Sequence, residues 1–171
     1  MTLNVYRPEQ KRAHRMKISI SKVQAHCDIP CKIYDPGTAQ YATLSVIRLL
    51  DLINELPDSL SIAQQAQLAR LVDQKETHST EVKQLVSTIW GDYFKQPQIT
   101  AFPEIHELVH SIMQQASRCK QGINRDDGEK LLISVNRFAE IFWHTKGVLT
   151  KTMLAPYPPA LPIVQPVLNE A

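Results

Sequence analysis

The stretch DGEKLLISVNRFAEIFWHTK, residues 127–146, decides the fold class. Its large apolar side chains recur with a helical period and therefore fall on one face of a helix. These side chains are Leu131, Leu132, Val135, Phe138, Ile141 and Phe142. The pattern predicts an amphipathic helix over about 127–146 that buries this face against other helices.

Three further segments show the same period, over about 38–56, 60–93 and 103–120. In the second, the run KETHST (75–80) predicts a bend or break, because Thr, Ser and His favour helices weakly. The run KQPQITAFP (95–103) carries two prolines and is expected to be a loop. Strand signals are absent throughout. We therefore expect an all-α protein, an antiparallel four-helix bundle.

The two ends of the chain differ from this central region. Residues 1–25 hold six basic side chains against one acidic side chain, whereas the whole chain has a net charge of +2. The basic character thus belongs to this leader, and a nucleic-acid partner for the body is not supported. The leader lacks the apolar core of a secretory signal, so it is a removable pro-segment or a basic arm. Residues 147–171 contain five prolines and predict an extended, proline-rich C-terminal tail.

Composition narrows the class of protein. A chain of 171 residues with 43% hydrophobic and 21% charged residues is typical of one soluble globular domain. Its apolar runs are shorter than the roughly 18 residues that cross a bilayer, so no membrane association is expected. Three cysteines are too few for a disulfide scaffold. Thiols that stay reduced or bind metal are typical of the cytoplasm, where we expect this protein.

The segment HCDIPCKIYDP (26–36) concentrates metal-ligating side chains. The thiolates of Cys27 and Cys31 can bind one ion, and soft thiolates select copper(I), zinc, iron–sulfur clusters or nickel. A structural zinc site needs two further ligands, and Cys119 is solitary. If cleavage freed the amine of His26, that amine, an adjacent backbone nitrogen and both thiolates would form a planar set. Such a set suits nickel(II) or copper(II), with the imidazole as an axial ligand.

The same segment resembles the metal-hook loop of the nickel superoxide dismutase family, written H-C-D-x-P-C-G-V-Y-D-P. Three further segments resemble that family in order and spacing: IWGDYFKQP (89–97), PEIHELV (103–109) and IFWHTK (141–146). The resemblance spans about 26–146, with a modest insertion between the first two helices. Residues 1–25 correspond to the removable leader of the family, and residues 147–171 are additional.

The resemblance implies a homohexamer of four-helix bundles, each with a flexible N-terminal metal-hook loop. The resemblance further implies an enzyme that disproportionates superoxide to oxygen and hydrogen peroxide with a nickel ion as cofactor. By the same resemblance, the nickel ligands would be the amine and imidazole of His26, the amide and thiolate of Cys27, and the thiolate of Cys31. Asp28 and Pro30 would shape the loop. A maturation protease would cleave before His26 to free its amine.

The resemblance also assigns residues around the ion. Tyr34 and Tyr93 would line the pocket and order water or the small anion through their hydroxyls. Lys32 stands where the family has glycine, so it could attract superoxide or require a different loop backbone. The family holds its axial histidine with a glutamate and an arginine, and Ala42 and His78 occupy these positions here.

Three alternative functions follow from the same residues. A non-catalytic or altered homologue of this fold could bind nickel or copper without turnover. The chain could instead be a plain helical oligomerisation module. The run HELVH (106–110) matches the zinc-metalloprotease pattern, with Glu107 as the base, but so short a pattern arises easily by chance. We expect its two histidines to face solvent or a subunit interface, and Cys119 to be buried.

Overall fold

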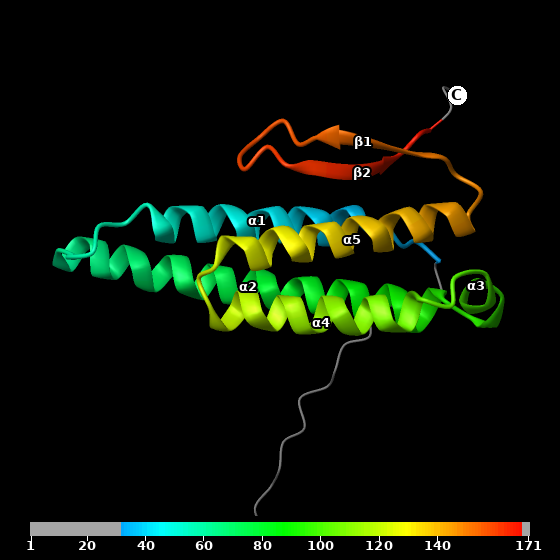
Figure 1. Ribbon diagram of the computed structural model, residues 1–171, viewed down its shortest axis with the longest axis horizontal. Coiled ribbons are helices and arrows are strands. Elements are labelled where there is room, and N and C mark those ends of the chain that lie inside the picture. The colour runs from blue at the N-terminus through cyan, green and yellow to red at the C-terminus, as the bar shows by residue number, and fades with distance from the viewer. Residues whose placement is uncertain (1–31, 169–171) are drawn as a thin grey trace, which may run out of the picture. The chain divides into compact units, whose positions relative to one another are not determined.

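The computed structural model describes residues 32–168 (Figure 1). Its four long helices are α1 (Gly37–Asn54), α2 (Ile62–Tyr93), α4 (Ile105–Gln121) and α5 (Arg125–Thr145). Helix α1 packs against α2 and α5, and α4 packs against the same two helices. Successive long helices run in opposite directions and close a bundle. The predicted antiparallel four-helix bundle is confirmed.

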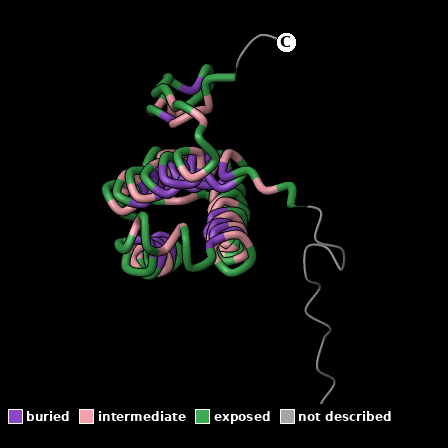
Figure 2. The backbone as a smooth tube through the Cα atoms, turned by 90° about the vertical axis from the view of Figure 1, so that its right-hand side faces the viewer, coloured by how far each residue is buried: buried purple, intermediate pink, exposed green. Residues whose placement is uncertain are grey.

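The core consists of the apolar faces that the sequence pattern predicts. Figure 2 shows the buried positions gathered where the helices face one another. The six apolar side chains that predicted α5 are all buried: Leu131, Leu132, Val135, Phe138, Ile141 and Phe142. Truncating a buried phenylalanine to alanine costs about 3–5 kcal/mol, so this face dominates the stability of the bundle. None of the helices within residues 32–168 is long and apolar enough to cross a membrane.

Helices α1 and α5 pack closely together at Gly128. A Cβ atom at this position would lie 2.8 Å from Cγ1 of Ile47 and 3.2 Å from Cδ1 of Leu50. Both neighbours are fully buried and cannot move away. A glycine in the first turns of α5 therefore permits this close packing, which seats the core face of the helix.

The predicted bend near 75–80 is wrong, because α2 continues unbroken for 32 residues. The hydroxyls of Ser79 and Thr80 donate to the carbonyls of Lys75 and Glu76, four residues earlier, at 2.7 and 2.8 Å. These side chains satisfy their hydrogen bonds on the helix itself and do not draw its backbone into another conformation. Packing of the middle of α2 against the bundle overrides the weak helix propensity of this run.

Lys75 anchors the middle of α2 to the end of α4. Its side chain is 2% exposed, and Nζ donates to the carbonyl oxygens of Cys119, Lys120 and Gly122 at 2.7, 2.7 and 2.8 Å. Burial lowers the pKa of Lys75. The three carbonyls at the negative end of α4 oppose that effect and favour the ammonium form. Lys75 thus satisfies carbonyls that have no partner within α4 itself.

The segment expected to be a loop at 95–103 contains a short helix, α3 (Gln96–Ala101). Pro97 is compatible with it, because the first turn of a helix does not use its backbone N–H groups. The side chain of Gln98 accepts a hydrogen bond from the N–H of Lys95 at 3.1 Å and caps the turn. The pattern does not predict α3, because Pro97 in a sequence usually marks a loop and is compatible with a helix only in its first turn.

The expectation of an extended tail without strands after residue 147 is wrong for the part that the structure describes. Residues Thr150–Leu154 (β1) and Pro162–Pro166 (β2) form an antiparallel hairpin (Figure 1). Ala155 and Ile163 are buried against the outer faces of α1 and α5. The hairpin therefore forms an additional layer on one side of the bundle.

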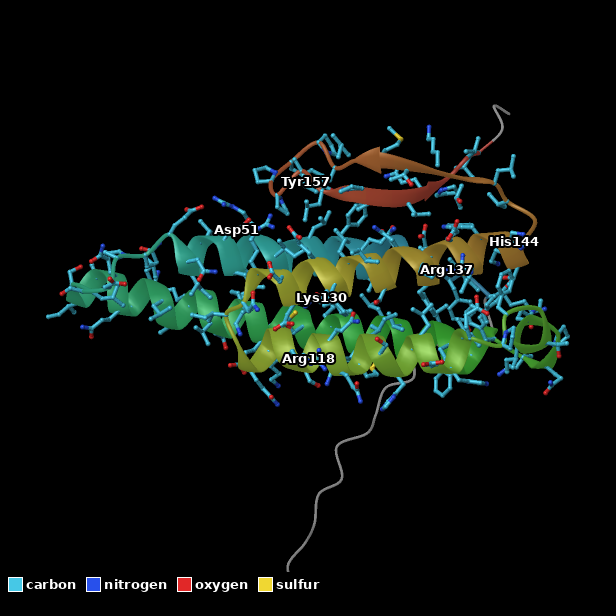
Figure 3. The ribbon with its side chains drawn as sticks, viewed as in Figure 1. Asp51, Arg118, Lys130, Arg137, His144 and Tyr157 are labelled. Atoms are coloured by element: carbon cyan, nitrogen blue, oxygen red, sulfur yellow. The ribbon has the colours of Figure 1, made fainter. Side chains whose placement is uncertain are left out.

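The hairpin tip makes a second contact with α1. The ring of Tyr157, labelled at the tip in Figure 3, lies edge-on to the ring of Tyr41, with the centroids 6.4 Å apart. Two effects raise the pKa of Tyr157. The larger is partial burial, and the smaller is the neighbouring Tyr41. Aromatic packing at the tip and aliphatic packing at the strands together hold the hairpin on the bundle.

Candidate metal centre

Tyr34 and Tyr93 are brought together at one end of the bundle. Tyr34 lies in the segment that leads into α1, and Tyr93 is the last residue of α2. Their ring centroids are 6.3 Å apart, with the ring planes at 54°. Both rings are half-buried and pack against the main core. Two tyrosines that are distant in the sequence thus lie side by side, where residues 32–36 lead into α1.

The hydroxyl of Tyr93 is held by α5. Its oxygen lies 2.7 Å from Oγ1 of Thr145, and Thr145 donates to the carbonyl of Phe142 at 2.7 Å. A threonine hydroxyl has one hydrogen, and Thr145 already donates it in the hydrogen bond to the Phe142 carbonyl. Tyr93 must then be the donor to Thr145. Its oxygen keeps lone pairs that can accept a hydrogen bond from a water or a protonated ligand.

A cation lies over the same aromatic ring. Nζ of Lys146 is 4.8 Å from the ring centroid of Tyr93 and 5.1 Å from that of Phe142. The ring of Phe142 also contacts that of Tyr93, with centroids 4.8 Å apart. The face of Tyr93 is therefore fixed by an aromatic contact and a cation–π contact, while its hydroxyl is fixed by Thr145.

Lys32 begins the described part of the hook segment, and its backbone φ is +59°. This is the left-handed region, which glycine enters without cost and other residues enter at a cost of about 1–2 kcal/mol. The lysine side chain is exposed. The chain thus keeps, with lysine, a backbone conformation that suits the glycine of the family motif. The predicted ligands His26, Cys27 and Cys31, together with Asp28 and Pro30, lie outside the described residues.

The two altered positions lie on α1 and α2. Ala42 is buried in the main core and offers no polar atom. His78 is half-buried, and its Nδ1 lies 2.9 Å from a carboxylate oxygen of Glu81. Ala42 cannot replace a glutamate as a hydrogen-bond acceptor, and His78 is engaged with its own helix.

The zinc-protease pattern on α4 is not supported by the geometry. Both histidines are exposed, as expected, but Nδ1 of His106 accepts a hydrogen bond from Nε1 of Trp90 at 3.1 Å. In the neutral imidazole the proton then resides on Nε2, which leaves that nitrogen unable to bind zinc beside His110. Within residues 32–168, no group of three or more His, Cys, Asp or Glu side chains could hold a metal ion.

The prediction that Cys119 is a small buried apolar residue is confirmed. Its side chain is 1% exposed in the core of α4, and burial raises the pKa of the thiol to about 11. A buried thiol that keeps its proton is a poor metal ligand. Cys119 is therefore not a candidate for the metal centre.

Sequence reasoning missed Thr145 and Lys146. Both belong to the quoted run IFWHTK (141–146), which was used only for its resemblance. Their spacing from Phe142 is a usable signal, since positions three and four residues apart share a helix face.

His144, labelled at the end of α5 in Figure 3, is exposed, and its ring lies edge-on to that of Phe102.

Comparison with known proteins places these features in one family of sequences. Residues 21–146 match the family model of nickel-containing superoxide dismutases. A nickel superoxide dismutase of Streptomyces seoulensis is 33% identical over 125 residues, which cover 73% of this chain and 91% of the relative. One of Streptomyces coelicolor is 33% identical over 126 residues, which cover 72% and 90%.

Solved structures agree with the sequence comparison. The native structure of a nickel superoxide dismutase superposes with a TM-score of 0.65 at 32% identity, covering 71% of this chain and 99% of that chain. An apo structure of a nickel superoxide dismutase gives a TM-score of 0.62 at 30% identity, covering 67% and 98%. The family match ends at Lys146, before the hairpin.

Proposed function

The chain belongs to the nickel-containing superoxide dismutase family, and we propose that it disproportionates superoxide to oxygen and hydrogen peroxide at a nickel ion bound by residues 26–31. The observation that supports this proposal is the family match over residues 21–146, which includes the hook motif and every helix of the bundle. The protein is accordingly an oxidoreductase with nickel as its cofactor.

The chemistry of the donor set fits nickel. Since no metal-binding group of side chains occurs within residues 32–168, the ligands we propose are those of the hook: His26, Cys27 and Cys31. Thiolates, a deprotonated backbone amide and an amine would be strong electron donors to a nickel ion bound by these residues. Such donors stabilise the trivalent state of nickel, and the bound ion would supply the redox couple between its divalent and trivalent states. Asp28 and Pro30 are proposed to shape the loop around it.

The proposed role of Tyr34 and Tyr93 is to order the small molecules beside the hook. Because the hydrogen of Tyr93 is donated to Thr145, the Tyr93 oxygen acts as an acceptor. It can hold a water that carries a proton toward the reduced oxygen species, since peroxide formation consumes two protons. Tyr34, whose ring lies against that of Tyr93, limits the space available to larger molecules.

Positive charge near this end of the bundle supports an anionic substrate. Lys32 is exposed at the start of the described segment, and Lys146 lies over the ring of Tyr93. Cations near a reaction site raise the local concentration of an anion such as superoxide and its rate of encounter. We propose Lys32 as a residue that attracts the substrate.

Two further features are proposed from the resemblance. Proteolysis between Ala25 and His26 would free the amine that completes the proposed donor set, and a maturation protease is required for it. The mature bundles assemble as a homohexamer in the cytoplasm, where the thiols of the hook stay reduced.

The deciding experiment compares superoxide dismutation by nickel-loaded protein that starts at a free His26 with that of the full chain 1–171. Activity in the trimmed form alone is the expected result. Tight nickel binding without turnover in the trimmed form would instead favour a metal-binding homologue that has lost the reaction. Such a result would trace to alanine and histidine at positions 42 and 78, where the family has a glutamate and an arginine.

Two variants control the ligand assignment. Cys27→Ser is expected to abolish nickel binding, because it removes one thiolate from the hook. His110→Ala is expected to leave nickel binding intact, because this side chain lies exposed on α4. Nickel retained by the first variant or lost by the second would contradict the proposed ligand set.

A further inference from the structure

One edge of the hairpin is closed by side chains of the bundle. The amide of Asn136 in α5 donates to the carbonyl of Pro162 at 2.8 Å and accepts from the N–H of Val164 at 3.3 Å. Gln40 of α1, 2% exposed, donates to the carbonyl of Val164 at 2.9 Å and to the Asn136 side chain at 2.8 Å. Together these two amides occupy the place that a neighbouring strand would take beside β2.

Prolines complete the closure of this edge. Two hydrogen bonds at the ends of the ladder fix its hydrogen-bonding pattern. The N–H of Ala155 donates to the carbonyl of Leu161, and the N–H of Val167 donates to the carbonyl of Leu149. Hydrogen-bonded pairs alternate along an antiparallel ladder, so Pro162 and Pro166 occupy positions that point away from β1. Proline has no N–H group to offer there, and it is a common means of blunting an edge strand.

The other edge has no such closure. By the same alternation, the backbone groups of Thr150, Thr152 and Leu154 point outward from β1. Within residues 32–168, these outward N–H and carbonyl groups have no hydrogen-bond partner. Figure 1 shows β1 farther from the helices than β2, and four of its five residues are exposed. An unprotected edge on a strand without proline is a template for another strand.

We propose that a second copy of this chain pairs with β1 through this edge, antiparallel and centred on Thr152. In that register Thr152 faces Thr152 of the second copy, and Thr150 faces Leu154. Every outward N–H and carbonyl group of the three residues then finds a partner. The two hairpins join into a four-stranded sheet across a two-fold axis, an isologous contact.

Charge disfavours one of the two neighbouring registers, the one centred on Lys151. Lys151 is the charged residue of β1, and a pairing shifted to bring it opposite its own copy would place two like charges in contact. Centred on Thr152, the pairing places Lys151 opposite Met153 of the second copy. The stem of lysine packs well on such a side chain. Met153 and Leu154 are 43% and 68% exposed in the single chain, so the pairing also buries apolar surface.

The pairing is weak by itself and independent of the metal site. A five-residue strand is about 17 Å long, and contacts of that size bury less than the roughly 1,200 Å² of stable interfaces. We therefore expect an equilibrium that depends on protein concentration. Since the family match ends at Lys146, the hairpin is an addition that gives this chain an assembly contact outside the family region.

The test is amide hydrogen exchange of the full chain, resolved by residue, at protein concentrations from about 10 μM to about 1 mM, the range in which a weak association is visible. The N–H groups of Lys151, Met153 and Ala155 belong to the intrachain ladder and are expected to be protected throughout. Those of Thr150, Thr152 and Leu154 are expected to gain at least about tenfold protection at the high concentration. Fast exchange of the outward set at every concentration would overturn the proposal.

Variants separate pairing from folding. Thr152→Pro removes the outward N–H at the centre and leaves the intrachain ladder intact, so Thr150 and Leu154 should lose their concentration-dependent protection. Thr152→Val keeps the N–H and should behave as the parent chain. Met153→Glu should strengthen the pairing through Lys151 of the second copy, and Met153→Lys should weaken it. Indistinguishable protection in the two Met153 variants would overturn this register.

Discussion

The hydroxyl oxygens of Tyr93 and Thr145 lie 2.7 Å apart, and they join the end of α2 to the end of α5. Because Thr145 donates its hydrogen to the carbonyl of Phe142, the Tyr93 hydroxyl has one direction in which it can donate. The bundle thus sets the orientation of a phenol whose ring lies beside that of Tyr34. Thr145 acts on the site only through this orientation.

We predict that Tyr93→Phe and Thr145→Val each lower kcat/KM for superoxide about tenfold, which corresponds to roughly 1.4 kcal/mol. The first removes the acceptor oxygen, and the second lets the hydroxyl turn. Each should also lower the free energy of unfolding by about 1 kcal/mol through the lost hydrogen bond. The measurement is steady-state dismutation with urea unfolding of the same nickel-loaded samples.

The double variant tests whether the two residues act as a unit. If Thr145 acts through Tyr93, Tyr93→Phe with Thr145→Val should be no less active than Tyr93→Phe alone. Multiplied losses in the double variant would show that Thr145 has an independent role.

The backbone of Lys32 gives a second prediction. With φ at +59°, glycine or asparagine fits this position, whereas a β-branched residue does not. Lys32→Gly should keep nickel affinity within about threefold, because relief of backbone strain offsets the entropy that glycine adds to the unfolded chain. Lys32→Val should weaken nickel binding at least about tenfold, the equivalent of roughly 1.4 kcal/mol of added strain.

Isothermal titration of the trimmed chain with nickel checks this prediction, and Lys32→Asn serves as the control that also removes the charge. Equal affinity of the Val and Asn variants would mean that this backbone conformation does not matter for the hook. A loss of kcat/KM common to the Gly and Asn variants, with affinity retained, would indicate that the lysine charge attracts superoxide.

The apolar period was enough to predict the bundle, because a helix face such as Val135, Phe138 and Phe142 must be buried wherever it occurs. The hairpin was not predictable in this way. Its prolines look like breakers in the sequence, and only the ladder reveals that Pro162 and Pro166 stand where no N–H is needed. A proline-rich run can therefore be an edge strand as well as an extended tail.

In the candidate site, too, some residues could be selected from the sequence and others could not. The resemblance to the family was enough to select Tyr34 and Tyr93, which the fold places side by side. Thr145 and Lys75 carry no pattern of their own, because their roles depend on partners that are remote in the sequence. The predicted bend in α2 was wrong for the same reason, since Lys75 anchors that region to the end of α4.

Lys75 offers a third prediction, on stability. Lys75→Met keeps the length of the side chain but leaves the carbonyls of Cys119, Lys120 and Gly122 without their donor. Losing several buried hydrogen bonds to a charged group should lower the free energy of unfolding by about 2–4 kcal/mol. Lys83→Met is the matched control on the same helix. Among residues 32–168, Nζ of Lys83 donates one hydrogen bond, to Oγ of Ser117, so its loss should cost about 1 kcal/mol or less. Equal losses in urea unfolding would contradict the capping role of Lys75.

The last prediction concerns Cys119, whose burial raises the pKa of its thiol from 9.0 to about 11. Below pH 9 the thiol is protonated in the folded and the unfolded chain, so it adds no pH dependence. Between pH 9 and 11 the unfolded chain releases this proton and the folded chain keeps it, so stability falls as pH rises. The loss approaches about 2–3 kcal/mol for a shift of this size. Cys119→Ala lacks this contribution, and its stability relative to the parent chain should rise by that amount across the same window in urea unfolding. A constant difference between the two proteins from pH 8 to 11 would show that the thiol titrates alike in both states.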